Sequence, residues 1–121
     1  TKVSGHNSSL FTGYKEISGH WWSQNICGAR GRGLFFEITK EYIWDLYIKQ
    51  YKKCAISGLD IFFNKSTTKK TGNISLDRID SSKGYTKDNV QIIHKTLNKI
   101  KNVYSNDEII YWAKLIVEFK S

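Results

Sequence analysis

The sequence predicts a small α+β domain, because one strand–turn–strand–helix unit stands out in a chain otherwise rich in helical spacing. The stretch 73–102 reads NISLDRIDSSKGYTKDNVQIIHKTLNKIKN. Apolar residues alternate toward Asp77, a Ser-Lys-Gly turn occupies 82–84, and a second apolar run follows at 90–93. From His94 onward the pattern becomes helical. We therefore expect a β-hairpin followed by a short helix.

The segments around this unit predict supporting helices. An irregular arm is expected over 1–16 and a single domain over 17–121. Within that domain, Ser18 and Thr39 are candidate N-caps for helices over about 17–28 and 40–52, joined by a short extended segment. A last, strongly apolar helix begins at Ser105 or Asn106. We expect that helix to pack across the core.

Composition points to a polyanionic partner. The chain of 121 residues has a formal net charge of +8, from 19 Lys and Arg against 11 Asp and Glu, and is 40% hydrophobic. It contains no apolar run of about 18 residues, so we expect no membrane span. No secretory signal is visible. The chain lacks methionine, even at position 1, and is therefore expected to be a processed protein or a fragment.

Basic side chains cluster in three places. Arg30 and Arg32 alternate with glycines after the first helix, where they would contact phosphates or simply favour a helix C-terminus. Polar loop 65–72 and the helical part of 73–102 supply the remaining lysines. The predicted DNA-contacting residues are Arg30, Arg32, Lys69, Lys70, Lys95, Lys99 and Lys101.

The residues ISLDRIDSSKGYTKDNVQIIHKTLNKIK resemble the motif of HNH endonucleases of the phage or mobile-element type. The preceding order, a tryptophan-bearing helix, ARGRGLFFEIT, an aromatic helix and KKCAISG, resembles a recurrent arrangement in phage HNH proteins. The similarity covers roughly residues 13–117. It implies a ββα-metal core, with the unit at 73–102 as its catalytic part and with flanking N-terminal and C-terminal helices.

The resemblance implies roles for four residues. Asp77 takes the first metal-ligand position and Asn98 the ligand position on the helix. Asn89 takes the position of an asparagine that braces the loop. A carboxylate oxygen and an amide oxygen suit Mg²⁺ or Mn²⁺, and Mg²⁺ is commonly completed by water and substrate phosphate. Arg78 stands where the family has its general-base histidine.

That arginine leaves the general base open. Arginine stays protonated, so Arg78 would bind the phosphate instead. His94 and Asp80 are the candidates for activating water, and attack by metal-bound water is a third route. His94 has a competing interpretation as a structural residue beside Cys54. A weakened or inactive nuclease that keeps DNA binding is a fourth possibility.

A structural zinc is not expected. Many family members hold one with two Cys-x-x-Cys pairs, and the matching positions here are Cys54, Ser57, His94 and Leu97. Leucine has no donor and serine is a poor zinc ligand. Cys27 and Cys54 are expected to be reduced thiols, at least partly buried, in a cytoplasmic protein.

The leading hypothesis is a metal-dependent endonuclease that hydrolyses double-stranded DNA. A DNA-binding module with a degenerate nuclease core is the alternative, and a small RNA-binding or ribosome-associated protein is a third. Composition fits this last class, but it does not explain the spacing of Asp77 and Asn98.

Overall fold

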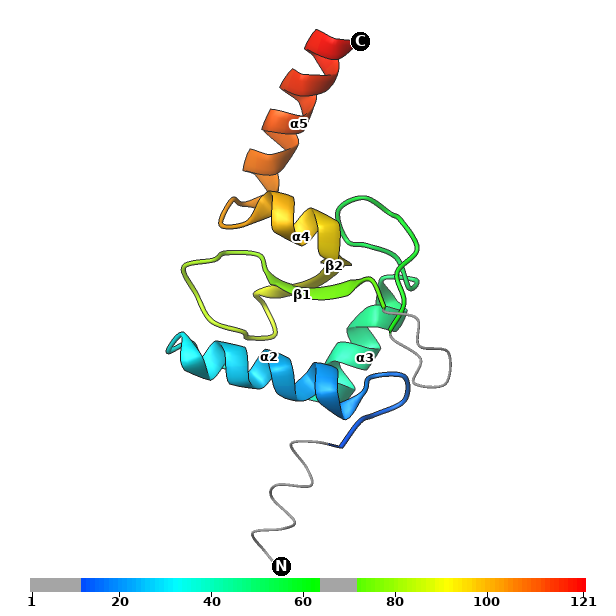
Figure 1. The fold of residues 1–121 in the computed structure, drawn as a ribbon, viewed down its shortest axis with the longest axis vertical. Coiled ribbons are helices and arrows are strands. Elements are labelled where there is room, and N and C mark those ends of the chain that lie inside the picture. The colour runs from blue at the N-terminus through cyan, green and yellow to red at the C-terminus, as the bar shows by residue number, and fades with distance from the viewer. Residues whose placement is uncertain (1–11, 64–71) are drawn as a thin grey trace, which may run out of the picture.

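The computed structural model describes residues 12–63 and 72–121, and within them the α+β class is confirmed. Two helices precede the two strands along the chain and two helices follow them, so the strands lie in the middle (Figure 1). In order, the elements are α2 (Gly19–Gly31), α3 (Lys40–Lys49), β1 (Ile74–Arg78), β2 (Val90–His94), α4 (Lys95–Lys101) and α5 (Asn106–Lys120).

The hairpin lies at the centre of the molecule. β1 and β2 pair antiparallel, with Ile74 opposite His94 and Arg78 opposite Val90. α4 lies on one side of the pair, and α2 and α3 lie on the other (Figure 1). Since a two-stranded hairpin is at best marginally stable alone, these helices stabilise it by covering both faces. The order β1, β2, α4 is compatible with the expected ββα unit.

Side-chain caps begin the helices where the sequence predicts. Ser18 and Thr39 accept hydrogen bonds from backbone N–H groups three residues on, and Ser105 forms a capping box with Glu108. α3 ends earlier than expected because Gln50 leaves the helix and bonds the free edge of β2. Its amide accepts from the Ile92 N–H at 3.1 Å and donates to the Ile92 carbonyl at 2.9 Å.

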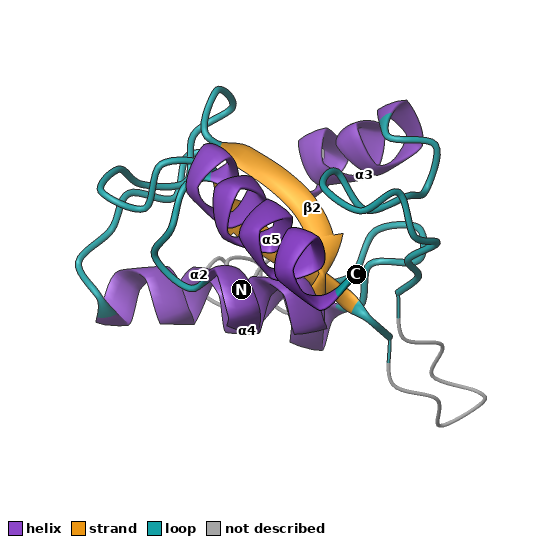
Figure 2. Ribbon diagram, turned by 90° about the horizontal axis from the view of Figure 1, so that it is seen from above, coloured by secondary structure: helices purple, strands orange, loops and turns teal. Residues whose placement is uncertain are grey.

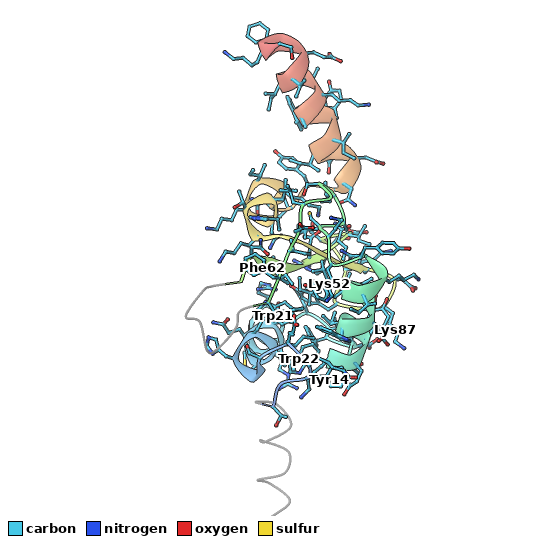
Figure 3. All side chains as sticks on the ribbon, turned by 90° about the vertical axis from the view of Figure 1, so that its right-hand side faces the viewer. Tyr14, Trp21, Trp22, Lys52, Phe62 and Lys87 are labelled. Carbon is cyan, nitrogen blue, oxygen red and sulfur yellow. The ribbon has the colours of Figure 1, made fainter. Side chains whose placement is uncertain are left out.

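The core lies between the hairpin and helices α2 and α3. Ile43, Ile92 and Ile93 are completely buried, which contributes about 1.5–3 kcal/mol each. Trp21 meets Phe63 edge to face at 5.2 Å, and Figure 3 shows the tryptophans of α2 against the rest of the body. The buried apolar residues are Ile17, Trp22, Ile26, Ala29, Ile38, Ile43, Tyr47, Cys54, Ile61, Phe63, Ile74, Leu76, Tyr85, Val90, Ile92 and Ile93.

The last helix does not pack across the core, so that expectation was wrong. α5 has no buried residue and projects away from the body beyond α4 (Figures 1 and 3). In the view from above, α5 points toward the reader and overlaps the hairpin in projection (Figure 2). Its first turn is held to the hairpin by hydrogen bonds between Asn106 and Gln91 at 2.9 and 3.1 Å. Its apolar side chains, including Ile116 and Phe119, are exposed.

The two cysteines are both free thiols. Cys54 is buried as expected, but Cys27 is exposed. Cys27 follows the buried Ile26 by one position, and neighbouring positions of a helix point about 100° apart, so it leaves the core face. Across residues 12–63 and 72–121, no helix has both the length and the apolar character that a membrane crossing requires.

Candidate metal and phosphate site

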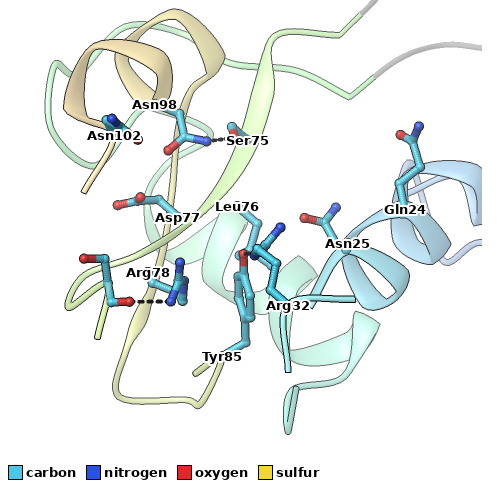
Figure 4. Close-up of a pocket in the computed structure, with 12 residues that line it drawn as sticks. Gln24, Asn25, Arg32, Ser75, Leu76, Asp77, Arg78, Tyr85, Asn98 and Asn102 are labelled. Carbon is cyan, nitrogen blue, oxygen red and sulfur yellow. Dashed lines mark hydrogen bonds between the residues drawn. The ribbon is translucent and has the colours of Figure 1, made fainter. Parts of the chain in front are cut away.

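A polar cavity of about 320 Å³ opens between α2, β1 and α4 (Figure 4). It unites residues from both halves of the chain, and the predicted residues Arg32, Asp77, Arg78 and Asn98 all line it. The complete lining is Gln24, Asn25, Gly28, Arg32, Ser75, Leu76, Asp77, Arg78, Ser81, Tyr85, Asn98 and Asn102.

Two polar cross-links join β1 to α4 beside this cavity. Ser75 and Asp77 are two residues apart on β1 and therefore share a face of the strand. Asn98 and Lys101 are three residues apart on α4 and share a face of the helix. Asn98 Nδ2 donates to Ser75 Oγ at 2.6 Å, and Lys101 Nζ lies 3.0 Å from Asp77 Oδ2.

Lys101 is therefore not a DNA-contacting residue, and that prediction was wrong. Its side chain has no exposed surface, and that of Asp77 is 6% exposed. The ammonium group also donates to the carbonyl of Arg78 at 3.2 Å. A buried charge requires a partner, and each member of this ion pair supplies it for the other. The ion pair thus fixes Asp77 against α4.

The contacts of Asp77 all use one carboxylate oxygen. Oδ2 receives Lys101 and the Gln91 Nε2 donor at 2.8 Å. Among the described residues, no hydrogen bond or ion pair uses Asp77 Oδ1. Every fully buried side-chain nitrogen or oxygen there has a partner, so Oδ1 keeps some exposed surface, and Asp77 is a residue of the cavity lining. The ion pair leaves this oxygen available.

Asn98 offers a second oxygen to the same space. Because its amide nitrogen is held by Ser75, its amide oxygen points to the side where Asp77 lies (Figure 4). One carboxylate oxygen and one amide oxygen are hard donors that suit Mg²⁺ or Mn²⁺. No cluster of three or more His, Cys, Asp or Glu side chains occurs in 12–63 and 72–121. The residues thus fit a two-ligand site that substrate phosphate and water complete.

Arg78 and Asn89 organise the loop that closes the hairpin. Asn89 is buried; its Oδ1 accepts from the Asp80 N–H at 2.8 Å, and its Nδ2 donates to the carbonyls of Asp80 and Gly84. This is the bracing geometry that the motif implies. Arg78 Nη1 donates to the carbonyls of Ser81, at 2.5 Å, and Lys83, at 3.0 Å. Asn89 therefore stabilises the loop, and Arg78 stays partly available to the cavity.

The two candidate bases lie elsewhere. Among the described residues, the cavity lining includes neither Asp80 nor His94. Asp80 Oδ1 accepts from the side chain and backbone N–H of Ser82, and these bonds lower the pKa of its carboxyl group. His94 is the N-cap of α4, where Nδ1 accepts from the Thr96 N–H at 3.0 Å. Both side chains therefore serve local backbone structure.

The positions matching a zinc knuckle form a hydrogen-bonded corner instead. The N–H groups of Ser57 and His94 each donate to Cys54 Sγ at 3.4 Å. Burial acts to raise the pKa of the Cys54 thiol, but the hydrogen bonds from Ser57 and His94 outweigh it, so the pKa is lowered. Leu97 packs against the core beside it. In this Cys54–His94 corner, hydrogen bonds and packing hold the four positions together, and the expected loss of the zinc site stays a prediction.

The remaining basic residues are spread more widely than the sequence suggests. Arg32 lines the cavity, whereas Arg30 is exposed in the last turn of α2 outside it. Lys95 and Lys99 are exposed on α4. Lys69 and Lys70 lie outside the described residues. The structure thus brings Arg32 and Arg78 together, although they belong to separate segments.

No family model, curated protein or solved structure matches this chain. The nuclease resemblance therefore depends on the motif residues, and the site on its own geometry.

Three residues that hold the predicted site residues in place were not themselves predicted from the sequence. Gln91 bonds Asp77, Ser75 orients Asn98, and Tyr85 contacts both arginines. Gln91 is directly opposite Asp77 in the hairpin register. Asp77 and Gln91 are each seven residues from Gly84 of the expected turn, so a symmetric hairpin about that glycine would have paired them. The contacts of Ser75 and Tyr85 depend instead on how α4 and α2 pack against β1.

Proposed function

We propose that this protein is a metal-dependent DNA endonuclease of the HNH type, with Asp77 and Asn98 as the metal ligands. One observation supports this most: Asp77 and Asn98 line a cavity that two arginines also line, and the supporting bonds of each use an atom other than Oδ1. Hard oxygen donors beside guanidinium groups provide the complementary contacts that a metal-bound phosphodiester requires. The net charge of +8 suits the same substrate.

Each residue has a defined task in this proposal. Asp77 Oδ1 and Asn98 Oδ1 would hold Mg²⁺ or Mn²⁺, which supplies Lewis-acid stabilisation of the phosphate and the leaving oxygen. Lys101 and Gln91 keep Asp77 oriented, and Ser75 does so for Asn98. Partners of this kind tune metal sites by about tenfold to a hundredfold.

Activation of water would not depend on a side chain in the cavity. Asp77 is the sole carboxylate in the described lining, and no imidazole is present there. The proton would then pass to solvent or to the substrate phosphate. Arg78 would neutralise charge on the phosphate, which is the role available to a group that stays protonated. The proposed substrate is double-stranded DNA, and the proposed location of the activity is the cytoplasm.

The test is nicking of supercoiled plasmid in Mg²⁺ or Mn²⁺, with EDTA as the blank. Asn98→Ala and Ser75→Ala form a matched pair because both remove the same hydrogen bond. Asn98→Ala also removes the ligand oxygen, so we expect a loss of about a hundredfold or more, against about tenfold for Ser75→Ala. Equal activity of Asn98→Ala and the parent would contradict the proposed site.

A degenerate nuclease core is the second candidate, and the Lys101 ion pair favours it. A buried ammonium already compensates the charge of Asp77, which weakens the attraction of a second cation to that carboxylate. In this case the protein would bind DNA in a salt-sensitive way without metal-dependent nicking. Stronger binding to single-stranded RNA in a competition assay would instead favour an RNA-binding role.

A further inference from the structure

Tyr85 contacts both arginines of the cavity. Arg32 Nη2, at the end of α2, donates to the Tyr85 hydroxyl at 2.9 Å. The guanidinium carbon of Arg78, at the end of β1, lies 5.5 Å from the centroid of the Tyr85 ring. Figure 4 shows the ring between the two guanidinium groups. One buried tyrosine therefore sets the positions of two cations that come from different parts of the chain.

The position of Tyr85 is itself fixed by the backbone. Its N–H donates to the Phe35 carbonyl, and its carbonyl accepts from the Glu37 N–H, both at 2.8 Å. Its ring packs on Phe36 at 5.2 Å. A Cβ atom on Gly84 would lie 2.8 Å from the Phe35 carbonyl oxygen, so this close approach requires glycine. The hairpin loop is thus locked to the segment after α2.

Both guanidinium groups retain donors for a ligand. Arg32 uses Nη2 for Tyr85, and Arg78 uses Nη1 for two loop carbonyls. An arginine has five N–H donors in a planar fork, and within 12–63 and 72–121 no hydrogen bond uses Nε or the second terminal nitrogen of either arginine. Asp77, the acidic residue of the lining, is already compensated by Lys101. The surplus charge of the cavity wall is therefore positive.

We propose that Tyr85 is a positioning residue that holds Arg32 and Arg78 as a two-arginine clamp for one backbone phosphate of DNA. This inference rests on the proposed nuclease function and deepens it. The tetrahedral phosphate offers oxygens to two forks at once, and guanidinium groups recognise it through paired hydrogen bonds. The clamp lies beside the oxygens of Asp77 and Asn98, so it holds the strand next to the metal position.

Binding of a short duplex of random sequence, measured in EDTA over a salt series, tests the clamp without any metal. Arg32→Gln is expected to weaken binding and to reduce the slope of log Kd against log salt by about 1. Tyr85→Phe removes only the hydroxyl that Arg32 uses, and we expect about a tenfold loss of affinity. Tyr42→Phe is the matched control, because it loses one hydroxyl bond, to the Lys87 carbonyl, outside the cavity.

The double variant separates positioning from general damage. If Tyr85 acts through Arg32, Tyr85→Phe has no further effect once Arg32→Gln is present. A purely structural role would weaken binding equally in both backgrounds and would overturn the inference. So would parent-like binding by Arg32→Gln, or equal losses in Tyr85→Phe and Tyr42→Phe.

The failure of the clamp and the failure of the nuclease are distinguishable. Plasmid nicking by a parent whose DNA affinity does not depend on Arg32 would reject the clamp and keep the nuclease. Arg32-dependent binding in a protein that does not nick plasmid in Mg²⁺ or Mn²⁺ would keep the clamp and reject the nuclease.

Discussion

The cavity beside Asp77 and the Cys54–His94 corner lie on the same hairpin and helix, yet they use their polar atoms differently. In the corner, the Cys54 sulfur receives two N–H donors and the imidazole of His94 caps α4. In the cavity, Asp77 and Asn98 each use one polar atom for support and leave one oxygen open. The corner therefore completes the local structure, whereas the cavity retains groups that can bind a ligand.

The largest expected effect concerns the ion pair behind the cavity. Lys101→Met leaves the Asp77 carboxylate without its cation, and we expect a loss of about 3–5 kcal/mol in the free energy of unfolding. Urea unfolding measures it. Lys99→Met is the matched control on the same helix, exposed and expected within about 0.5 kcal/mol of the parent.

The double variant Asp77→Leu with Lys101→Met tests whether that loss of stability comes from the unpaired buried charge. Replacing both charges with apolar groups is expected to recover most of the stability while abolishing metal binding. A Lys101→Met protein as stable as the parent would show that the ion pair does not support the site. For this reason Asp77→Ala alone is a poor test of catalysis, because it leaves a buried ammonium unpaired.

A smaller effect is expected in the corner. His94→Ala removes the N-cap acceptor of α4 and should cost about 1 kcal/mol of stability, whereas His94→Asn keeps an acceptor. Because His94 does not line the cavity, both variants should nick plasmid at nearly the parent rate. A folded His94→Asn protein that is about a hundredfold slower would identify His94 as the general base.

The smallest effect concerns Asp80. Like Cys54 Sγ and His94 Nδ1 in the corner, Asp80 Oδ1 already accepts hydrogen bonds from nearby residues. Hydrogen bonds from Ser82 lower the pKa of Asp80 below its ordinary 3.8, so its contribution to stability is present above that pH. The contribution is lost as the pH falls through the folded-state pKa. Thermal unfolding of the parent and Asp80→Asn should therefore differ most near neutral pH and converge in acid. A difference that grows in acid would contradict this assignment.

Local rules account for much of what the sequence predicted. The caps at Ser18, Thr39 and Ser105 depend on neighbouring residues, and all appear in the structure. The hairpin pairing also appears, but loop 79–89, with hydrogen-bonded turns at 80–83 and 86–89, joins the strands in place of a three-residue turn at 82–84. Asp77 and Asn98 line one cavity, and their role as metal ligands stays a prediction.

Tertiary contacts account for what the sequence missed. A lysine is exposed by default, and nothing local distinguishes Lys101 from Lys99 until α4 packs on β1. Arg30 and Arg32 likewise lie two residues apart at the glycine-rich end of α2, and of the two it is Arg32 that bonds Tyr85. The apolar content of α5 shows that it has a surface suited to packing but does not specify against what. These outcomes depend on the whole fold.

The most direct test of the metal site is a crystal structure of the parent protein soaked in Mn²⁺, with an anomalous difference map. The structure predicts one peak in the cavity, about 2.0–2.5 Å from the Asp77 and Asn98 side-chain oxygens. The peak should disappear in Asn98→Ala crystals soaked in the same way. Ordered Asp77 and Asn98 side chains with no peak between them, or a peak only at other carboxylates, would contradict the proposed site.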